Sequence, residues 1–309
     1  MKRKINRVGA STLTVSLPSK WARQYGLKQG DEIEVSEEGS ALQMSTNRES
    51  TPHCVEINMH GSWRLKRRYV YNAYRRGFDE ILFHFETPKE LDEIKDYLDD
   101  LIGFEVIEHG ENYCKAKSIT LPSEMEFENL LRRYFLLLSN MANDCYKELN
   151  EGKTGFLENI AKQDKVINKI YLFLTRMINK KRDSLQEPMY LYLMIDNMEE
   201  IGDAYRDLCF YYANKKIKFN KQLLLIFKRI NDLLRVSYEN FYKYDLKKED
   251  FFYYERDKLF DALNNMPDKL QKDEIVFFHW LFDILVRIYN LASPIMAINL
   301  KEVFSYNSK

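Results

Sequence analysis

The spacing of apolar and polar residues changes twice along this 309-residue chain. In residues 1–46, apolar positions alternate with polar ones, most clearly over 12–17, which predicts short half-buried strands. The stretch 18–26, which opens on proline and closes on glycine, predicts one short helix. About 46 residues of this kind cannot bury a stable core alone. The pattern therefore predicts that a second copy of the chain completes the segment.

A polar linker at 47–52 leads to a middle segment, residues 53–119, in which predicted strands and helices alternate. The predicted strands are 54–59, 80–85, 104–108 and 113–119, and the predicted helices are 62–76 and 88–101. This βαβαββ order predicts a small α/β sandwich with its helices on one face of the sheet.

From residue 121 to 309 the apolar residues recur with the 3.6-residue period of helices. The predicted helices are 123–150, 154–182, 188–216, 220–245, 248–265 and 269–303, and Pro294 should kink or shorten the last. Long helices with short connections predict an antiparallel bundle, and six of them suggest two three-helix repeats. An echo between Asp164-x-x-x-Asn168 and Asp257-x-x-x-Asp261, 93 residues later, agrees with such a repeat. The fold class is thus multidomain.

Charge changes the picture of the first segment. The chain has 47 basic and 47 acidic residues, and a net charge of zero disfavours a nucleic-acid-binding protein when taken at face value. Residues 1–30, however, contain seven lysines and arginines and no acid. Because charge acts within a Debye length of about 10 Å, the neutral total does not exclude DNA contact by this segment.

The cysteines and the length of the apolar runs indicate the cellular compartment. The four cysteines are scattered without a CxxC pair, which favours buried thiols in a reducing compartment. No uninterrupted apolar run approaches the roughly 20 residues that span a bilayer, and the first residues lack a signal-peptide apolar core. We therefore expect a cytoplasmic protein without a membrane-inserted segment.

Three stretches of the first segment resemble a known family. Residues 7–9 (RVG), 12–18 (TLTVSLP) and 26–35 (GLKQGDEIEV) resemble the swapped-hairpin DNA-binding domain of SpoVT/AbrB-type transcription regulators. In that family two copies interlace their strands, so the resemblance implies a homodimeric β-barrel head over residues 1–46. It also implies DNA-binding positions at Arg7, Lys20 and Arg23, with Arg3 and Lys4 on the first strand. The alternative is a basic face that only confers solubility.

A second basic run lies in the predicted helix 62–76. It consists of Arg64, Lys66, Arg67, Arg68, Arg75 and Arg76, with no acid between residues 60 and 78. This run could add DNA contacts or hold an anion. It could also be a solvated face that pairs with the acidic helix of the same domain.

The predicted helix 188–216 carries acids at helical spacing, namely Asp196, Glu199, Glu200, Asp203 and Asp207. Like charges at this spacing destabilise a helix unless a cation binds them. Oxygen-only ligands suit Mg²⁺, Ca²⁺, Mn²⁺ or ferric iron. The alternative is an acidic solvated face that pairs with lysines of neighbouring helices.

The stretch Met198-Glu199-Glu200-Ile201-Gly202-Asp203 resembles the Leu-Glu-Arg-Ile-Gly-Asp stretch of PhoU, the phosphate-uptake regulator built from two three-helix repeats. The resemblance covers about residues 121–309 and implies metal ligation by Glu199, Asp203, Asp257 and Asp261. Val286 and Asn290 stand where the family has acids, and Asn168 weakens a third motif, so one metal site is expected to be lost or reduced.

Together the two resemblances imply a DNA-binding transcriptional regulator of phosphate uptake, of a type common in archaea. Its dimeric head contacts DNA, and its PhoU-like part senses or relays phosphate status to a phosphate transporter or signalling protein. We do not expect an enzyme. One alternative is a scaffold that regulates a phosphate transporter or its sensor kinase without binding DNA. A metal-dependent phosphohydrolase ranks last, because the sequence offers no obvious nucleophile or general base.

Overall fold

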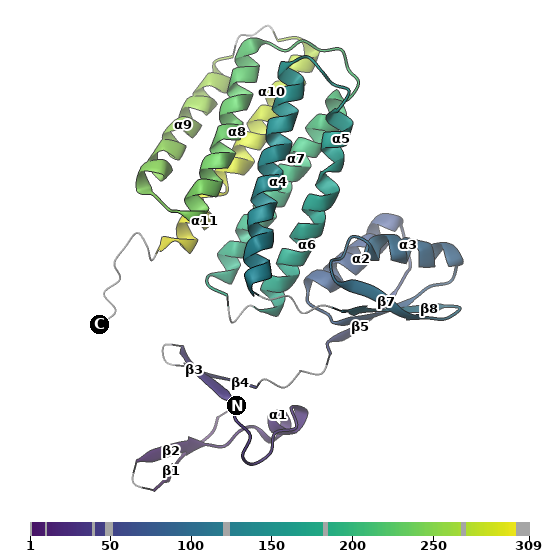
Figure 1. Cartoon of the computed structure of the whole chain (residues 1–309), viewed down its shortest axis with the longest axis vertical. Coiled ribbons are helices and arrows are strands. Elements are labelled where there is room, and N and C mark those ends of the chain that lie inside the picture. The colour runs from purple at the N-terminus through teal and green to yellow at the C-terminus, as the bar shows by residue number, and fades with distance from the viewer. Residues whose placement is uncertain are drawn as a thin grey trace. The chain divides into compact units, whose positions relative to one another are not determined.

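The computed structural model describes residues 2–9, 11–38, 41–46, 52–119, 124–181, 185–266 and 270–300. The chain divides into two compact units, residues 1–53 and residues 54–309. It is multidomain, with a small strand-containing segment, a mixed sheet and a helical region in chain order (Figure 1). Most of the predicted linker at 47–52, the predicted break at Pro267 and the end of the last predicted helix lie outside the described residues.

The first unit contains two antiparallel hairpins and one short helix. The hairpins are β1 (Ile5–Val8) with β2 (Thr12–Val15) and β3 (Glu34–Glu38) with β4 (Ala41–Ser45), and the helix is α1 (Ser19–Gln24). The predicted strands and helix are confirmed, but Arg3 and Lys4 precede β1 instead of lying on it.

The apolar residues of these hairpins are not half-buried in a single copy. None of the described side chains of this unit is buried. The exposed large apolar residues are Ile5, Val8, Leu13, Val15, Val35 and Leu42. The strands form because of their local pattern, whereas burial needs a second layer that one copy does not provide.

The middle segment begins the second unit and has the predicted βαβαββ order. Its elements are β5 (Cys54–Asn58), α2 (Trp63–Arg75), β6 (Glu80–His84), α3 (Pro88–Leu98), β7 (Phe104–His109) and β8 (Tyr113–Ser118). The sheet order is β5-β6-β8-β7, in which only β5 and β6 are parallel. Ile81, Phe83, Cys114 and Ala116 are buried, and the register of β6 with β8 places them on one face of the sheet. Helices α2 and α3 lie on one side of the sheet, so the predicted sandwich is confirmed (Figure 1).

The helical region follows the predicted boundaries with one break that the sequence did not predict. Its helices are α4 (Glu124–Asn150), α5 (Leu157–Lys162), α6 (Asp164–Lys180), α7 (Pro188–Tyr212), α8 (Lys221–Tyr242), α9 (Leu246–Asn264), α10 (Lys272–Tyr289) and α11 (Ala292–Ile298). The predicted helix 154–182 starts later and is interrupted at Gln163, where the sequence has no proline or glycine. The sequence pattern gave no signal for that break.

Pro294 interrupts the last predicted helix, as expected. Proline lacks an N–H, so the carbonyl of Asn290, four residues earlier, receives no helical hydrogen bond from it. Asn197 Nδ2 of α7 donates to that carbonyl at 3.1 Å. The break therefore falls between α10 and α11, ahead of the proline, and a neighbouring helix satisfies the orphaned oxygen.

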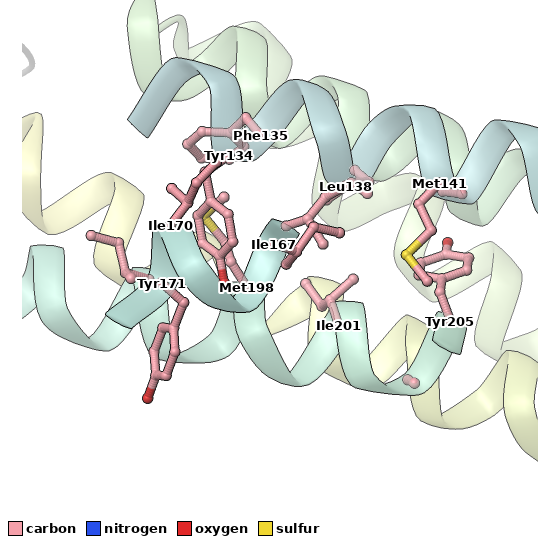
Figure 2. Packing of buried hydrophobic residues seen from close by; sticks show 14 of the residues in the cluster. Tyr134, Phe135, Leu138, Met141, Ile167, Ile170, Tyr171, Met198, Ile201 and Tyr205 are labelled. Carbon is pink, nitrogen blue, oxygen red and sulfur yellow. The ribbon is translucent and has the colours of Figure 1, made fainter. Parts of the chain in front are cut away.

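Residues of α4, α6 and α7 form one part of the bundle core (Figure 2). In this part Gly202 allows a close approach of the helices. A Cβ added there would lie 3.2 Å from Leu138 Cδ2 and 3.4 Å from Ile167 Cγ2. Met198 and Ile201 are fully buried. Three residues of the PhoU-like stretch thus have packing roles.

The bundle contains two sets of three packed elements. Helices α4, α6 and α7 contact one another, as do α8, α9 and α10, and the sets meet through α4 with α8 and α7 with α10. This arrangement agrees with two three-helix units. Their kinship with PhoU repeats stays a prediction.

One described stretch, Lys272–Ile298, is long and apolar enough to cross a membrane by length and composition alone. It corresponds to α10 and α11, and Phe277, Leu281 and Ile284 within it are fully buried in the bundle. A core helix of a globular bundle has the same composition. The absence of a membrane-inserted segment stays a prediction.

Candidate functional site

The middle segment, from β5 to β8, is called the sheet domain below. Its helix α2 is bound at its C-terminal end to helix α6 of the bundle. The buried Arg176 donates from Nη1 to the carbonyl oxygens of Tyr74 and Phe78, both at 2.8 Å. Asn179 Nδ2 donates to the carbonyl of Arg75 at 2.8 Å. A cation at the C-terminus of a helix is favourable because the last carbonyls there have no helical partners. These bonds hold the sheet domain against the bundle.

Arg75, which belongs to the second basic run, also holds the sheet domain against the bundle. Its guanidinium lies 4.8 Å from the centre of the Tyr171 ring and 3.6 Å from Asp196 Oδ1, and it contacts the Tyr192 hydroxyl. The Tyr171 hydroxyl donates to Asp196 at 2.7 Å. Asp196, the first acid of the helix 188–216 series, is therefore engaged in the contact between the two domains.

A cleft of about 600 Å³ lies between the N-terminal half of α2 and helices α6 and α7. A second hollow of about 770 Å³ extends it toward the C-terminal end of α3. The residues that line both are Trp63, Arg67, Tyr71, Asn168, Leu172 and Arg206. The two hollows therefore form one continuous recess, named here the α2 cleft.

One wall of the α2 cleft is basic and includes a helix N-terminus. Arg64, Arg67 and Arg68 line it, and within the described part of the chain none of these guanidinium groups has an ion-pair partner. Ser62 precedes the helix without a side-chain cap, and no acid occurs in its first turn. The first N–H groups of α2 and its dipole therefore add to the positive potential of the arginines.

Lys66 of the same run behaves differently. Its ammonium lies 2.7 Å from Glu90 Oε1 and 3.2 Å from Glu93 Oε2, both on α3. The hydrogen bond to Glu90 is the main cause that raises the pKa of Lys66. Pairing with the acidic helix, one of the alternatives from the sequence, thus applies to Lys66 and not to the arginines around it.

The opposite wall of the α2 cleft is acidic and organised by Arg206. Its guanidinium contacts Asp203 and lies 3.2 Å from Asp164 Oδ2 and 2.8 Å from Asp207 Oδ1. Asn168 Nδ2 also donates to Asp164 Oδ2 at 2.7 Å. Asp164 is 6% exposed, and its Oδ1 has no hydrogen-bond partner in the part of the chain that the structure describes. Three of these carboxylates thus share one internal cation.

Glu199 stands on this wall with no ion pair among the described residues. Burial raises its pKa to about 7, and the nearby carboxylates of Asp203, Asp164 and Asp196 act in the same direction. Arg206 opposes the shift. Glu199 can therefore gain or lose a proton near neutral pH, and its carboxyl is free to accept or donate a hydrogen bond.

The four predicted metal ligands do not form one cluster. Glu199 and Asp203 line the α2 cleft, whereas Asp257 and Asp261 are exposed on α9. Asp257 Oδ1 lies 2.6 Å from Arg256 Nη1. Among the described residues, no group of three or more His, Cys, Asp or Glu is arranged to hold a metal ion.

As the side chains lie, arginines occupy the positions that a metal ion would take. The residues therefore do not fit a bound Mg²⁺, Mn²⁺, Ca²⁺ or iron without moving Arg206 or Arg256, and metal ligation stays a prediction. On α7, the helix that carries Glu199 and Asp203, Glu200 Oε2 lies 2.7 Å from Arg287 Nη1. Apart from Glu199, the acids of this series on α7 thus pair with arginines and not with the lysines that the sequence suggested.

The residues predicted to bind DNA all lie in the first unit and are exposed, namely Arg3, Lys4, Arg7, Lys20 and Arg23. Lys20 and Arg23 are on α1. The register of the first hairpin pairs Arg7 with Leu13, so their side chains share a face. Because Leu13 is 63% exposed, Arg7 borders an exposed apolar surface of the hairpin.

The comparison with known families finds a match in the first unit. Residues 7–43 match the family described as "Antidote-toxin recognition MazE, bacterial antitoxin". No curated protein and no solved structure matches the chain. The first unit is thus a MazE/AbrB-like domain, which fits the swapped-hairpin head. Because the match ends at residue 43, it gives no support to the PhoU resemblance of residues 121–309.

Sequence reasoning identified both walls of the α2 cleft but not the cleft. The arginines at 64–68 and the acids at 199–207 were separate features, more than 100 residues apart in the chain. Only the packing of α2 on α6 places them opposite each other. Trp63, which also lines the cleft, carried no functional signal in the sequence, and Asn168 figured there only as a weakened metal motif.

Proposed function

We propose that this protein is a DNA-binding transcriptional regulator whose head, completed by a second copy, contacts DNA. The observation that supports this most is the match of residues 7–43 to the MazE family. Domains of the MazE/AbrB type usually bind DNA and form dimers.

The exposed apolar residues of the head support a dimer. Leu13, Val35 and Leu42 are each more than half exposed, and a few dozen residues cannot bury a core without added surface. A second copy that packs against these hairpins removes this apolar surface from water. The arrangement is the one that the swapped-hairpin resemblance implies.

The charge of the head supports contact with the DNA backbone. Seven basic residues and no acid occur in residues 1–30, so a dimer presents twice that number, 14. Lysines and arginines near phosphates release condensed counterions, which gives salt-dependent affinity for any DNA sequence. Arginines can in addition read guanine edges in the major groove.

The test is selection of binding sites by the full-length protein from a random pool of DNA duplexes. We expect enrichment of a two-fold symmetric motif, because a two-fold dimer reads two equivalent half-sites. A pool that stays random after repeated rounds, at several salt concentrations, contradicts the proposal.

A second part of the proposal concerns the signal to which the regulator responds. We infer from the PhoU resemblance of residues 198–203 that the helical region relays phosphate status. Genome-wide occupancy should then differ between phosphate-rich and phosphate-poor cells. Equal occupancy in both states contradicts the phosphate link and leaves the DNA-binding proposal standing.

A further inference from the structure

The α2 cleft combines three guanidinium groups that have no ion pair within the described ranges, an exposed aromatic surface and hydrogen-bond acceptors in one recess. We propose that it is a binding site for a nucleotide, that is, a nucleoside mono- or polyphosphate. The proposal goes beyond DNA binding by the head and does not rest on it, because it concerns only residues of the second unit.

The phosphate end of the ligand is assigned to the N-terminus of α2. Arg64, Arg67 and Arg68 provide charge-assisted donors, and the uncapped N–H groups after Ser62 provide further donors. A helix N-terminus alone would not define a site. Here the three arginines, which have no ion-pair partner among the described residues, give the second and independent indication of an anion.

The base of the nucleotide is assigned to the surface of Trp63. Trp63 is 55% exposed, which is unusual for the largest apolar side chain unless it contacts a partner. Aromatic side chains and stacked guanidinium planes attract flat heteroaromatic rings. The Arg64 guanidinium already lies 5.3 Å from the centre of the Trp63 ring, so the cation and the aromatic surface are adjacent.

The facing wall supplies acceptors for the N–H groups of a base. Glu199 and Asn168 both line the cleft, and a carboxylate and an amide oxygen are the acceptors that amino and ring N–H groups require. Asp203 and Asp164 are already held by Arg206. The cleft therefore has a cationic end and an acceptor end, which suits a ligand with a phosphate and a separate donor group.

A small ligand fits the cleft better than duplex DNA, the other anion that the basic run could contact. The wall opposite the arginines carries Asp164 and Asp203, and the hollow that extends it is lined by Asp96, Asp99 and Asp100 of the sheet domain. These carboxylates repel a continuous phosphate backbone. The hollow that the arginines line has a volume of about 600 Å³, which lies within the range of small-molecule sites.

Calorimetric titration of the full-length chain tests the site. The probes are ATP, GTP, CTP, UTP and AMP, with inorganic phosphate and adenosine as one-ended compounds. We expect at least one nucleotide to bind, and both one-ended compounds to bind at least about tenfold more weakly, because each uses one end of the cleft. The proposal is overturned if no nucleotide of the panel binds, or if inorganic phosphate binds as tightly as the best nucleotide.

Two variants test whether the nucleotide binds in the α2 cleft. Replacement of both exposed arginines, Arg64→Ala with Arg68→Ala, should weaken nucleotide binding about tenfold or more because charge-assisted bonds to phosphate are lost. Arg133→Ala on α4, another exposed arginine outside the cleft, is the matched control and should bind as the parent does. Circular dichroism confirms that each variant is folded.

If the double variant binds nucleotide as tightly as the parent, or loses only as much affinity as the control, the nucleotide does not bind in this cleft. A double variant that loses affinity for duplex DNA but keeps its affinity for nucleotides assigns the arginines to DNA and overturns the proposal. The nucleotide titrations do not depend on whether the head binds DNA.

Discussion

The two units of this chain handle their apolar residues in opposite ways. In the head, which extends to residue 53, none of the described side chains is buried. In the second unit, large side chains such as Tyr134, Tyr205 and Phe227 are fully buried. A correct local pattern is thus enough to form hairpins but not to form a core. The second unit supplies its own core, whereas we expect the head to complete its core with a second copy.

The largest expected effect is the loss of a core side chain in the second unit. Phe227 on α8 is fully buried and packs against the rings of Tyr205 and Phe277. Phe227→Ala should lower the free energy of unfolding by about 4 kcal/mol, because transfer and cavity costs add. Urea denaturation measures the change. A loss below about 1 kcal/mol would show that this part of the core can collapse around the gap.

A charge on the apolar surface of the head should weaken dimerisation and leave the folding of the second unit unchanged. Leu13→Lys places an ammonium where we expect the second copy to pack, which should cost about 3 kcal/mol of dimer stability. Light scattering after size exclusion should show a shift toward monomer, while the unfolding of the helical region stays as in the parent. An unchanged dimer would mean that other surfaces of the chain hold the two copies together.

Glu199 should make the second unit less stable as the pH rises. Its pKa is raised from an ordinary value of 4.5 to about 7, so the folded state binds a proton that the unfolded state has already lost in that window. Stability therefore falls as pH rises from about 4.5 to about 7 and stays lower above it.

Glu199→Gln removes this dependence. The variant should be more stable than the parent at pH 8 by about 2 kcal/mol, a figure reduced from the full shift because the side chain is only partly buried. At pH 4 the two proteins should be nearly equal. Thermal unfolding across this range provides the measurement, and Glu200→Gln, an exposed neighbour, is the control. A parent with pH-independent stability between 5 and 8 would contradict the raised pKa.

The smallest expected effects are those of single basic residues of the head. Lys20→Ala or Arg23→Ala should each weaken DNA binding by about 1 kcal/mol and reduce the slope of log affinity against log salt by about one per contact. Fluorescence anisotropy at several salt concentrations measures both quantities. Arg133→Ala on α4 serves as the control, and a slope that no head variant changes would place the DNA contacts elsewhere.

Local spacing determined most of the secondary structure. The βαβαββ order and the interruption at Pro294 follow from residues within a few positions of one another. The break at Gln163 has no such signal, so the pattern did not reveal it. Similarly, the basic character of the first 30 residues is a property of the sequence alone, and the expectation of a partner rests on the short length of the head.

The candidate cleft was decided by the tertiary structure. Arg64 and Glu199 belong to segments whose local patterns say nothing of each other. Their meeting depends on long-range bonds such as that from Arg176 to the carbonyl of Tyr74, 102 residues away. Periodicity records which face of a helix is apolar, but the partner of that face depends on the packing of the whole unit. The sequence therefore determined the elements and their charges, and the docking of α2 on α6 determined which charges face each other.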